Sequence, residues 1–548
     1  MAKVIIHFED KKINSYQQDK QLYFVEGTIY KRTNLDFTEI NNWLNNLNGF
    51  YSIVCLESFK QINDECYEAE NIYAAVDRIR SKPLFYSHSD NLLYISDSVE
   101  WLRKKLKINA ISQLNKFEFL MTGYVTGSET LFDRIKQLQT GEYLSLNGNN
   151  LSTKKYYLYE HFEPKEFDEK YLLKELDNIC DKIIKKAIEY ANNRQIVIPL
   201  SGGYDSRLIA LKLKQLSYSN IVTFTYGLPN NKESNLSEKI AKSLGFKWFF
   251  VEYNSKILPK ELIETGLLDK YEKYASNAVS LPHIQDFYAI KKLLDNRLIE
   301  ENAVVIPGHT ADFITGSHIP EELFLNINYK KVIDYIIENH YSLNQTLKLS
   351  NDLYNKLSNQ LSKNDIITNI EIANEFEKWE WQERQAKFIA NSVRVYDYFE
   401  LDWWLPFWDV DFMEFWQKIP FILRKDHKWY INYVESVFKK ITNTKYDIGN
   451  SNEYSNYYKT KSISKLKKLI KNYLNKHNPN LLKRIKNVNK IIRSIIKTTD
   501  TNDLTYLLFS NSKHQKFYYD NYKKNISTNG ILALYYINLL EGITQNDK

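Results

Sequence analysis

The sequence predicts an α/β protein in which a strand-rich N-terminal domain precedes a doubly wound parallel sheet with helical C-terminal additions. Three observations lead to this fold class. Short apolar runs bounded by turn residues recur through residues 1–150. From Ile196 onward, buried-strand patterns alternate with helical patterns at short spacing. A turn with two adjacent glycines follows the first of these strands, at the edge where parallel sheets bind ligands.

The N-terminal domain is expected to cover residues 1–150. The apolar runs that predict its strands are Ile29–Tyr30, Phe50–Leu56, Ile72–Val76 and Leu92–Ser96. Residues 151–195 are expected to form a bridge, because apolar residues between Phe167 and Ala191 recur at helical spacing. We expect a second domain over residues 196–450 and a basic helical extension over residues 451–548.

The stretch Ile196–Arg207 predicts an anion-binding loop. Ile196–Leu200 is short, apolar and partly β-branched, like a central parallel strand. Gly202 and Gly203 permit a sharp turn, and a helical pattern follows Asp205. Such a turn directs backbone N–H groups and the positive helix end at one anion. The stretch has neither a Walker Gly-Lys-Ser/Thr nor a dinucleotide fingerprint, and an ordinary tight turn is the alternative.

Further strands are expected on both sides of this loop. Ile221–Leu228 and Trp248–Val251 are apolar runs, and the helical pattern between them ends with Gly245 as a C-cap. Another buried strand, Val304–Ile306, leads into the loop Pro307–His318, which contains Gly308, Asp312 and Gly316. This alternation predicts that both loops lie at the carboxyl edge of one parallel sheet.

Composition and charge are those of an ordinary soluble protein. Of the 548 residues, 43% are hydrophobic and 26% are charged, and the net charge of +7 is mild for this length. No apolar run approaches the length of a membrane span. The apolar segment within Met1–Asp10 is too short for a secretory signal. Cys55, Cys66 and Cys180 form no disulfide or zinc pattern. We therefore expect a cytoplasmic protein.

Residues from about 40 to 450 resemble the class B asparagine synthetases. Leu47–Ile53 and Asp77–Tyr86 are similar to a strand and a Lys-Pro-Leu turn of that family's glutaminase domain. Thr130–Leu144 is similar to its Thr-Leu-Phe passage. Ser201–Ser206 resembles the Ser-Gly-Gly-x-Asp-Ser loop of the PP-loop ATP pyrophosphatases. The resemblance implies a shortened Ntn-type α+β sandwich followed by a PP-loop domain of the adenine nucleotide α-hydrolase type.

The resemblance also implies ATP and Mg²⁺ as cofactors. The loop would hold the pyrophosphate that ATP releases on adenylating a carboxylate, while Asp205 and Asp312 would share Mg²⁺, an ion that prefers oxygen ligands. In the family, backbone at the end of the second strand reads adenine. The implied nucleotide-binding residues are Leu200, Ser201, Gly202, Gly203, Asp205, Ser206, Tyr226, Gly227 and Gly308.

Two departures from the family pattern change the expected activity. The family's glutaminase uses a cysteine directly after the initiator Met, and Ala2 stands in that place, so we expect a degenerate glutaminase-like domain. Cys55 is a free thiol that could take the place of the missing cysteine. It lies inside an apolar strand, where thiols are usually inert. His309 replaces a Glu of the second loop. It either contacts the pyrophosphate or serves as an acid or base, or it is a satisfied loop histidine.

Residues of the C-terminal half complete the expected site. Arg394 and Asp409, near a segment similar to the family's Arg-Val-Pro-Phe-Leu-Asp, are candidates for the acceptor pocket. Lys445 is the best counterpart of a family lysine that stabilises charge on the intermediate, with Lys439 and Lys440 as competitors. The candidate catalytic residues are Asp205, His309 and Lys445.

Residues 459–497 form a basic segment. Lys and Arg recur there without any acidic residue, and two amphipathic helical patterns are separated by Pro479. The segment is either a solvated helical face or a surface for anionic lipid or a phosphate-bearing carrier. Nucleic acid is not expected as a partner, because the segment carries no recognition motif.

These features predict an ATP-dependent, AMP-forming carbon–nitrogen ligase that joins a carboxylate to ammonia or an amine. The ammonia would be free ammonia from solution or would be supplied by a separate glutaminase. One hypothesis for the acceptor is a uronic acid of bacterial surface polysaccharide, since family relatives with loops similar to Gly308–Thr310 occur in such pathways. The alternatives are a glutamine-hydrolysing asparagine synthase, an intramolecular amide former like β-lactam synthetases and lasso-peptide cyclases, and a non-catalytic nucleotide-binding regulator.

Overall fold

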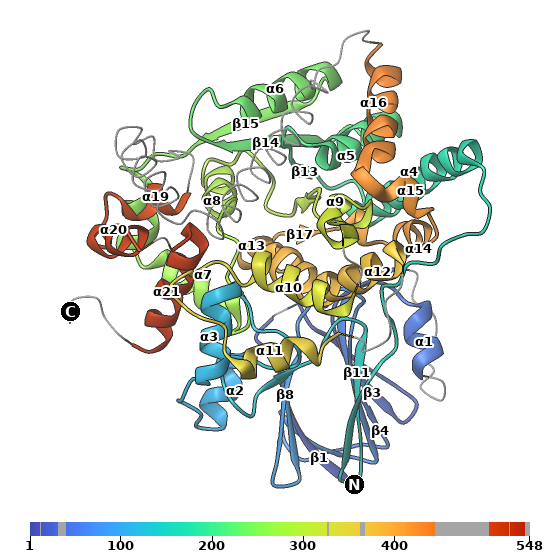
Figure 1. The fold of residues 1–548 in the computed structure, drawn as a ribbon. Helices are drawn as coiled ribbons and strands as arrows, with labels where there is room; N and C mark the ends of the chain where they lie inside the picture. The colour runs from blue at the N-terminus through green and yellow to red at the C-terminus, as the bar shows by residue number, and fades with distance from the viewer. Residues whose placement is uncertain are drawn as a thin grey trace.

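The computed structural model of the protein describes residues 1–10, 12–30, 40–325, 328–361, 368–443, 504–524 and 526–542. Its N-terminal part is a sandwich of two six-stranded sheets, which stands at the base of Figure 1. One sheet has the order β10-β8-β9-β1-β6-β5 and the other the order β12-β11-β7-β4-β3-β2. The strands are β1 (Ala2–His7), β2 (Asn14–Gln18), β3 (Gln21–Tyr30), β4 (Asn48–Glu57), β5 (Lys60–Gln61), β6 (Cys66–Ala69), β7 (Asn71–Val76), β8 (Phe85–Ser89), β9 (Leu92–Ser96), β10 (Lys136–Gln137), β11 (Glu142–Asn147) and β12 (Asn150–Lys155).

The two sheets pack face to face over an apolar core. Neighbouring strands are antiparallel apart from β1 and β9, which run parallel. Val4 of β1 and Leu93 of β9 meet Val54 of β4 and Ile72 of β7 in one buried cluster. This alternation of inward apolar side chains is what a sandwich requires. The four strands predicted in this region lie within β3, β4, β7 and β9. Three helices accompany the sheets: α1 (Ile40–Asn46), α2 (Val99–Lys105) and α3 (Gln113–Thr122).

The second part of the protein is built on a parallel sheet of five strands with the order β15-β14-β13-β16-β17. Its strands are β13 (Ile196–Pro199), β14 (Ile221–Gly227), β15 (Lys247–Glu252), β16 (Val304–Val305) and β17 (Asp402–Trp403). All of its pairings are parallel. The chain runs outward from β13 to β14 and β15 and then returns to the other side of β13 for β16. The sheet is therefore doubly wound, with its switch point between β13 and β16.

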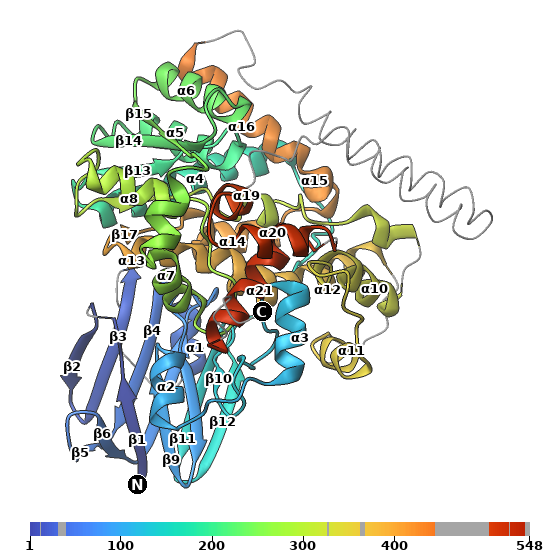
Figure 2. The same cartoon turned by 90° about the vertical axis from the view of Figure 1, so that its left-hand side faces the viewer.

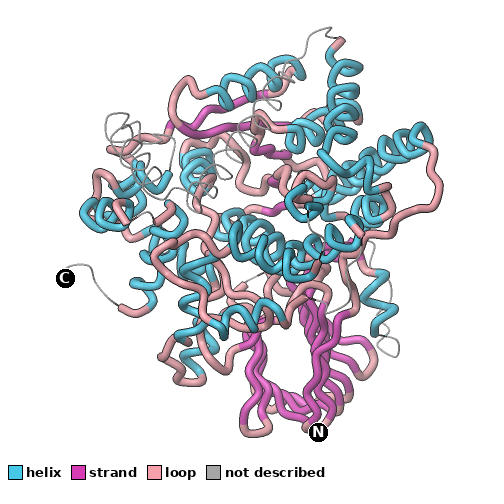
Figure 3. Tube along the Cα trace, viewed as in Figure 1, coloured by secondary structure: helices cyan, strands magenta, loops and turns pink. Residues whose placement is uncertain are grey.

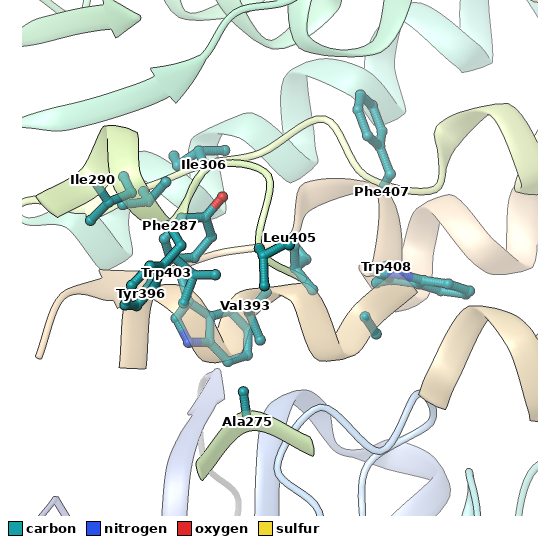
Figure 4. Packing of buried hydrophobic residues seen from close by; sticks show 14 of the residues in the cluster. Ala275, Phe287, Ile290, Ile306, Val393, Tyr396, Trp403, Leu405, Phe407 and Trp408 are labelled. Atoms are coloured by element: carbon teal, nitrogen blue, oxygen red, sulfur yellow. The ribbon is translucent and has the colours of Figure 1, made fainter. Parts of the chain in front are cut away.

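Helices cover both faces of this sheet. They are α4 (Glu169–Ala191), α5 (Tyr204–Gln215), α6 (Lys232–Leu244), η1 (Pro259–Glu264), α7 (Leu267–Ser276), α8 (Phe287–Asp295), α9 (Ala311–Ile314), η2 (Glu321–Leu325), α10 (Tyr329–His340), α11 (Asn351–Ser358), α12 (Asn369–Glu380), η3 (Trp381–Ile389), η4 (Ala390–Val393), α13 (Arg394–Tyr398), η5 (Pro406–Trp408), α14 (Val410–Gln417), α15 (Phe421–Arg424), η6 (Lys425–His427) and α16 (Lys428–Thr442). Figure 4 shows Phe287 of α8 and Tyr396 of α13 packed with Trp403 and Ile306 beneath the sheet. α5 and α6 lie on the opposite face, above β13 and β14 in Figure 1.

The local predictions around the sheet are largely confirmed. α6 ends at Leu244, and Gly245 follows it as a left-handed C-cap with a φ of 70°. The helical pattern expected from Phe167 to Ala191 is α4, which begins at Glu169. α5 begins at Tyr204, earlier than the apolar pattern indicated, because Gly203 already serves as its N-cap. Figure 3 shows how the strands gather at the base and how helices dominate the rest.

The C-terminal helices α19 (Leu504–Phe509), α20 (Gln515–Tyr522) and α21 (Thr528–Leu540) return to the body of the protein. Leu508 and Ile531 are fully buried. Figures 1 and 2 both show α21 beside α3, although about 400 residues separate them in sequence. The basic segment 459–497 lies outside the described residues. Within the part of the chain that the structure describes, no helix is long and apolar enough to cross a membrane.

A buried lysine joins the sandwich to the parallel-sheet domain. Lys82 Nζ lies 3.0 Å from Asp397 Oδ1 of α13 and 3.6 Å from Glu26 Oε1 of β3. All three side chains are at most 8% exposed. The ammonium group also lies 5.4 Å from the centre of the Trp403 ring in β17. Because a charge buried without its partner is costly, this group constrains how the two parts meet.

Lys82→Met should destabilise the protein by about 3 to 5 kcal/mol, because it removes the ammonium group that the buried side chains of Glu26 and Asp397 share. Lys3→Met is the matched control, since Lys3 is 60% exposed and lies 3.4 Å from Glu68, a pair expected to contribute less than about 1 kcal/mol. Urea unfolding followed by circular dichroism measures both. Equal shifts for the two variants would contradict a structural role for Lys82.

Candidate active site

The loop after β13 folds into a compact turn that opens α5. Ser201 N donates to Ser206 Oγ at 3.1 Å, and Gly203 N donates to Ser201 Oγ at 3.1 Å. The carbonyl of Leu200 accepts hydrogen bonds from Thr225 Oγ1 and Ser237 Oγ, each at 2.6 Å, so that the loop is fixed to β14 and α6. Leu200 itself is buried. The first turn of α5 thus presents a rigid, positively polarised helix end suited to phosphate.

The loop after β16 touches this turn directly. A Cβ built on Gly308 would lie 2.4 Å from Ser206 N, which no side chain can occupy. Gly308 is therefore needed here because of a close backbone approach. Two residues on, Thr310 holds a φ of 79°, an uncommon value for a β-branched residue, as the N-cap of α9. This tight path brings Asp312 in α9 against Asp205 in α5.

Asp205 and Asp312 meet across the switch point of the sheet. Asp312 N donates to Asp205 Oδ2 at 3.2 Å. Burial raises the pKa of Asp205 well above its ordinary value, and the charge of Asp312 adds to this rise. Two adjacent carboxylates repel each other, and a divalent cation relieves that repulsion. Among the described residues no group of three or more His, Cys, Asp and Glu side chains could hold a metal. Carboxylate oxygens are ligands that Mg²⁺ accepts, and this ion is usually held by one or two carboxylates together with substrate phosphates.

Sequence reasoning missed the residues that orient Asp312. His318 Nε2 lies 3.0 Å from Asp312 Oδ2, and its Nδ1 lies 2.6 Å from Glu380 Oε1 at the end of α12. Burial opposes a charge on His318, but Glu380 and Asp312 outweigh it and raise the pKa of His318 to about 10. The pKa of Asp312 shifts in the opposite direction. Burial raises this pKa, but the charge of His318 lowers it below the ordinary value. Sixty-two residues separate His318 from Glu380, and no local pattern connects them.

His309 is surrounded by Ser392, His283 and Asp286. Its Nδ1 lies 3.0 Å from Ser392 Oγ, and its ring centre lies 6.2 Å from that of His283. His283 Nε2 is in turn 3.2 Å from Asp286 Oδ1. Burial, assisted by His283, lowers the pKa of His309 to about 4. The imidazole is therefore neutral near pH 7, where it accepts or donates a hydrogen bond but supplies no positive charge.

Tyr226 and Gly227 end β14 and line a cavity of about 770 Å³. Gly227 has a φ of 129°, a conformation that favours glycine. The ring of Tyr226 stacks on that of Tyr253, with centres 5.0 Å apart. The structure therefore places both predicted residues at a concave surface next to the Ser201–Ser206 loop, which we call the phosphate-type loop.

The remaining predicted residues are Lys445, Arg394 and Asp409. Lys445 lies outside the described residues. Arg394 is buried, pairs with Asp397 at 3.2 Å and covers the Tyr274 ring. Asp409 is also buried and accepts from Lys186 Nζ at 2.8 Å, and it caps α14. Both residues have structural roles because their charges are already neutralised.

Two of the three cysteines are poor nucleophiles. Cys55 and Cys180 are buried in β4 and α4, and Cys66 is partly buried at the start of β6. Burial raises the pKa of the Cys55 and Cys180 thiols above their ordinary value. Because the thiolate is the reactive form, neither buried thiol is suited to attack a glutamine amide.

The pKa of His309 leads to a stability prediction. Below pH 6.5 the unfolded chain binds a proton at this residue, whereas the folded protein does not until about pH 4. The wild-type protein therefore loses stability as pH falls through this window. His309→Gln has no such group and should lose about 2 kcal/mol less between pH 7 and pH 5. Urea unfolding at the two pH values measures the difference, and equal losses in both proteins would contradict a neutral, buried His309.

Comparisons with known proteins agree with this arrangement. A family model described as a glutamine amidotransferase domain matches residues 41–157, and one described as asparagine synthase matches residues 186–441. An asparagine synthetase (glutamine-hydrolysing) from Bacillus subtilis is 24% identical over 260 residues, which are 45% of this chain and 37% of that protein. The match thus spans less than two-fifths of the relative's length.

Two solved structures are among those to which the chain is similar. An NH₃-dependent NAD synthetase from Campylobacter jejuni has 17% identity and a TM-score of 0.20, covering 35% of this chain and 93% of the other. An NMN synthetase from Francisella tularensis has 13% identity and a TM-score of 0.21, covering 40% and 97%. The two family models match one chain in the order in which the sandwich and the parallel sheet follow each other. The protein therefore belongs to an asparagine synthase class B-like family.

Proposed function

We propose that this protein is an ATP-dependent carbon–nitrogen ligase that forms an amide and releases AMP and pyrophosphate. One observation carries the proposal: the Ser201–Ser206 loop and Asp312 meet at the switch point of a parallel sheet, with Asp312 N donating to Asp205 Oδ2. A rigid helix start beside two carboxylates is suited to phosphates together with a divalent cation. The membership in an asparagine synthase class B-like family supports the same reaction class.

The first half-reaction is adenylation of a carboxylate. An oxygen of the substrate carboxylate attacks the α-phosphorus of ATP, the bond to the bridging oxygen breaks, and pyrophosphate leaves. The positively polarised first turn of α5 would hold the departing phosphates. Asp205 and Asp312 would hold Mg²⁺, which supplies charge neutralisation on the phosphate oxygens. His318 and Glu380 keep Asp312 oriented and ionised for that role.

The second half-reaction forms the amide. The nitrogen of ammonia or of an amine attacks the acyl carbon, AMP leaves, and the nitrogen loses a proton. We propose that this chain does not obtain the nitrogen from glutamine by itself. The support is the burial of Cys55 and Cys180, which raises the pKa of both thiols and disfavours the thiolate.

For the acceptor we propose a hydroxyl-bearing carboxylate such as a uronic acid, as in bacterial surface polysaccharides. An amino-acid acceptor carries an ammonium group, which calls for a carboxylate partner. His309 stands where the family has a Glu, and its imidazole is neutral near pH 7. With Ser392 at 3.0 Å it offers hydrogen-bond donors and acceptors without charge. Sugar hydroxyls match such groups better than an ammonium does.

Asp205→Ala should reduce carboxylate-dependent exchange between ATP and labelled pyrophosphate by about 100-fold or more, because it removes half of the cation site. The exchange is measured with glucuronic acid, galacturonic acid and L-aspartate as carboxylates. Asp133→Ala, on an exposed loop of the sandwich domain, is the control and should keep wild-type exchange. Exchange that survives in Asp205→Ala would show that this loop is not the nucleotide site.

Ammonium labelled with ¹⁵N should appear in the amide product, and unlabelled glutamine should not dilute the label. Mass spectrometry of the product from a reaction containing both compounds measures this. Glutamine-derived nitrogen in the product would contradict the proposed loss of glutaminase activity. An amide product without label from either source would favour an intramolecular amide former.

A further inference from the structure

The cavity at the end of β14 has a second wall that comes from the C-terminal helices. Tyr226 and Gly227 line one side of this space of about 770 Å³, and Thr505, Thr528 and Asn529 line the other. The volume lies in the range of small-molecule sites. α19 packs against η1 and α21, and Figure 1 shows α21 beside α7. Residues more than 270 positions apart in sequence thus share one cavity.

The cavity lies one strand away from the phosphate-type loop. Pro199 of β13 pairs with Phe224 of β14, so that Tyr226 lies beside the first residues of the loop. Adjacent strands are about 4.8 Å apart. On the other side of the loop, Gly308 packs against the backbone of Ser206 and leaves no room for a side chain. If the phosphates of a nucleotide occupy the loop, the space for its nucleoside therefore lies on the side of β14.

The lining is aromatic and mostly uncharged. Tyr226 and Tyr253 present stacked rings with an angle of 14° between them. Gln285 and Asn529 supply amide groups, and Thr528 supplies a hydroxyl. Flat aromatic surfaces and neutral hydrogen-bonding groups suit a heteroaromatic base and a ribose, while the charged groups Asp205, Asp312 and His318 lie together on the β16 side of the loop.

We propose that α19 and α21 complete the pocket for the nucleoside of ATP, with Thr528 and Asn529 in contact with its base or ribose. The proposal rests on the function proposed above. The wall is firmly placed: Ser527 N donates to Leu343 O at 2.9 Å, and Tyr535 OH donates to Asp269 Oδ1 at 2.6 Å in α7. Leu532, which also lines the cavity, is only 5% exposed. The C-terminal helices therefore form part of the site itself.

Calorimetric titration of the full chain with Mg²⁺–ATP and with Mg²⁺–triphosphate tests this inference, because inorganic triphosphate has no nucleoside. Thr528→Trp fills the cavity and should lower the affinity for ATP at least about 30-fold. The affinity for triphosphate should stay within about twofold of the wild-type value. Asn529→Ala is a milder change and should weaken ATP about fivefold, the effect of one lost hydrogen bond. Asn538→Ala, about 13 Å further along α21, is the matched control and should bind both ligands normally.

Wild-type affinity for ATP in both Thr528→Trp and Asn529→Ala would overturn the inference and leave the proposed function standing. Equal weakening of ATP and triphosphate would also overturn it, because the effect would then not be on the nucleoside. A wild-type protein that binds neither ligand would overturn the proposed function together with the inference. A lower affinity for ATP with an unchanged affinity for triphosphate supports the inference that the C-terminal helices contact the nucleoside.

Discussion

The close approach of Gly308 to the backbone of Ser206 is the constraint on which the rest of the site depends. With no Cβ between them, the loops after β13 and β16 touch, and Asp312 is brought to Asp205. Two ionised carboxylates near each other repel unless positive charge lies nearby. His318, held by Glu380 from α12, supplies such charge on one side of Asp312. The arrangement leaves the face toward the loop amides for phosphate and its cation.

Local sequence patterns predicted the parts of the fold that are set by neighbours in sequence. The apolar run of β13, the two glycines after it and the C-cap at Gly245 each follow from backbone chemistry over a few residues. The placement of Asp205 and Asp312 at one edge follows from parallel topology, in which carboxyl ends of strands share an edge. These features needed no knowledge of distant contacts, and the structure reproduces them.

Long-range contacts were beyond such patterns. The Asp312–His318–Glu380 group joins α9 to α12, and the Lys82 group joins β3 to α13, with no shared periodicity. Arg394 and Asp409 were expected in a pocket because of their motif. Asp409 pairs with Lys186, 223 residues away in the sequence, whereas Arg394 pairs with Asp397 on its own helix. The C-terminal part was expected to be an extension because of its basic character. Residues 529–540 nevertheless contain apolar side chains on all sides, which is typical of a buried helix.

The packing of α21 gives the sandwich domain a role that does not require a reactive thiol. The ring of Phe119 in α3 lies 5.6 Å from that of Tyr536, and Lys116 of the same helix pairs with Glu541 just beyond α21. Tyr535 anchors the opposite side of α21 on α7. The helix that lines the cavity is thus held between the N-terminal part and the parallel-sheet part. Because burial against both fixes its position, the sandwich domain contributes to the shape of the neighbouring pocket independently of any glutaminase chemistry.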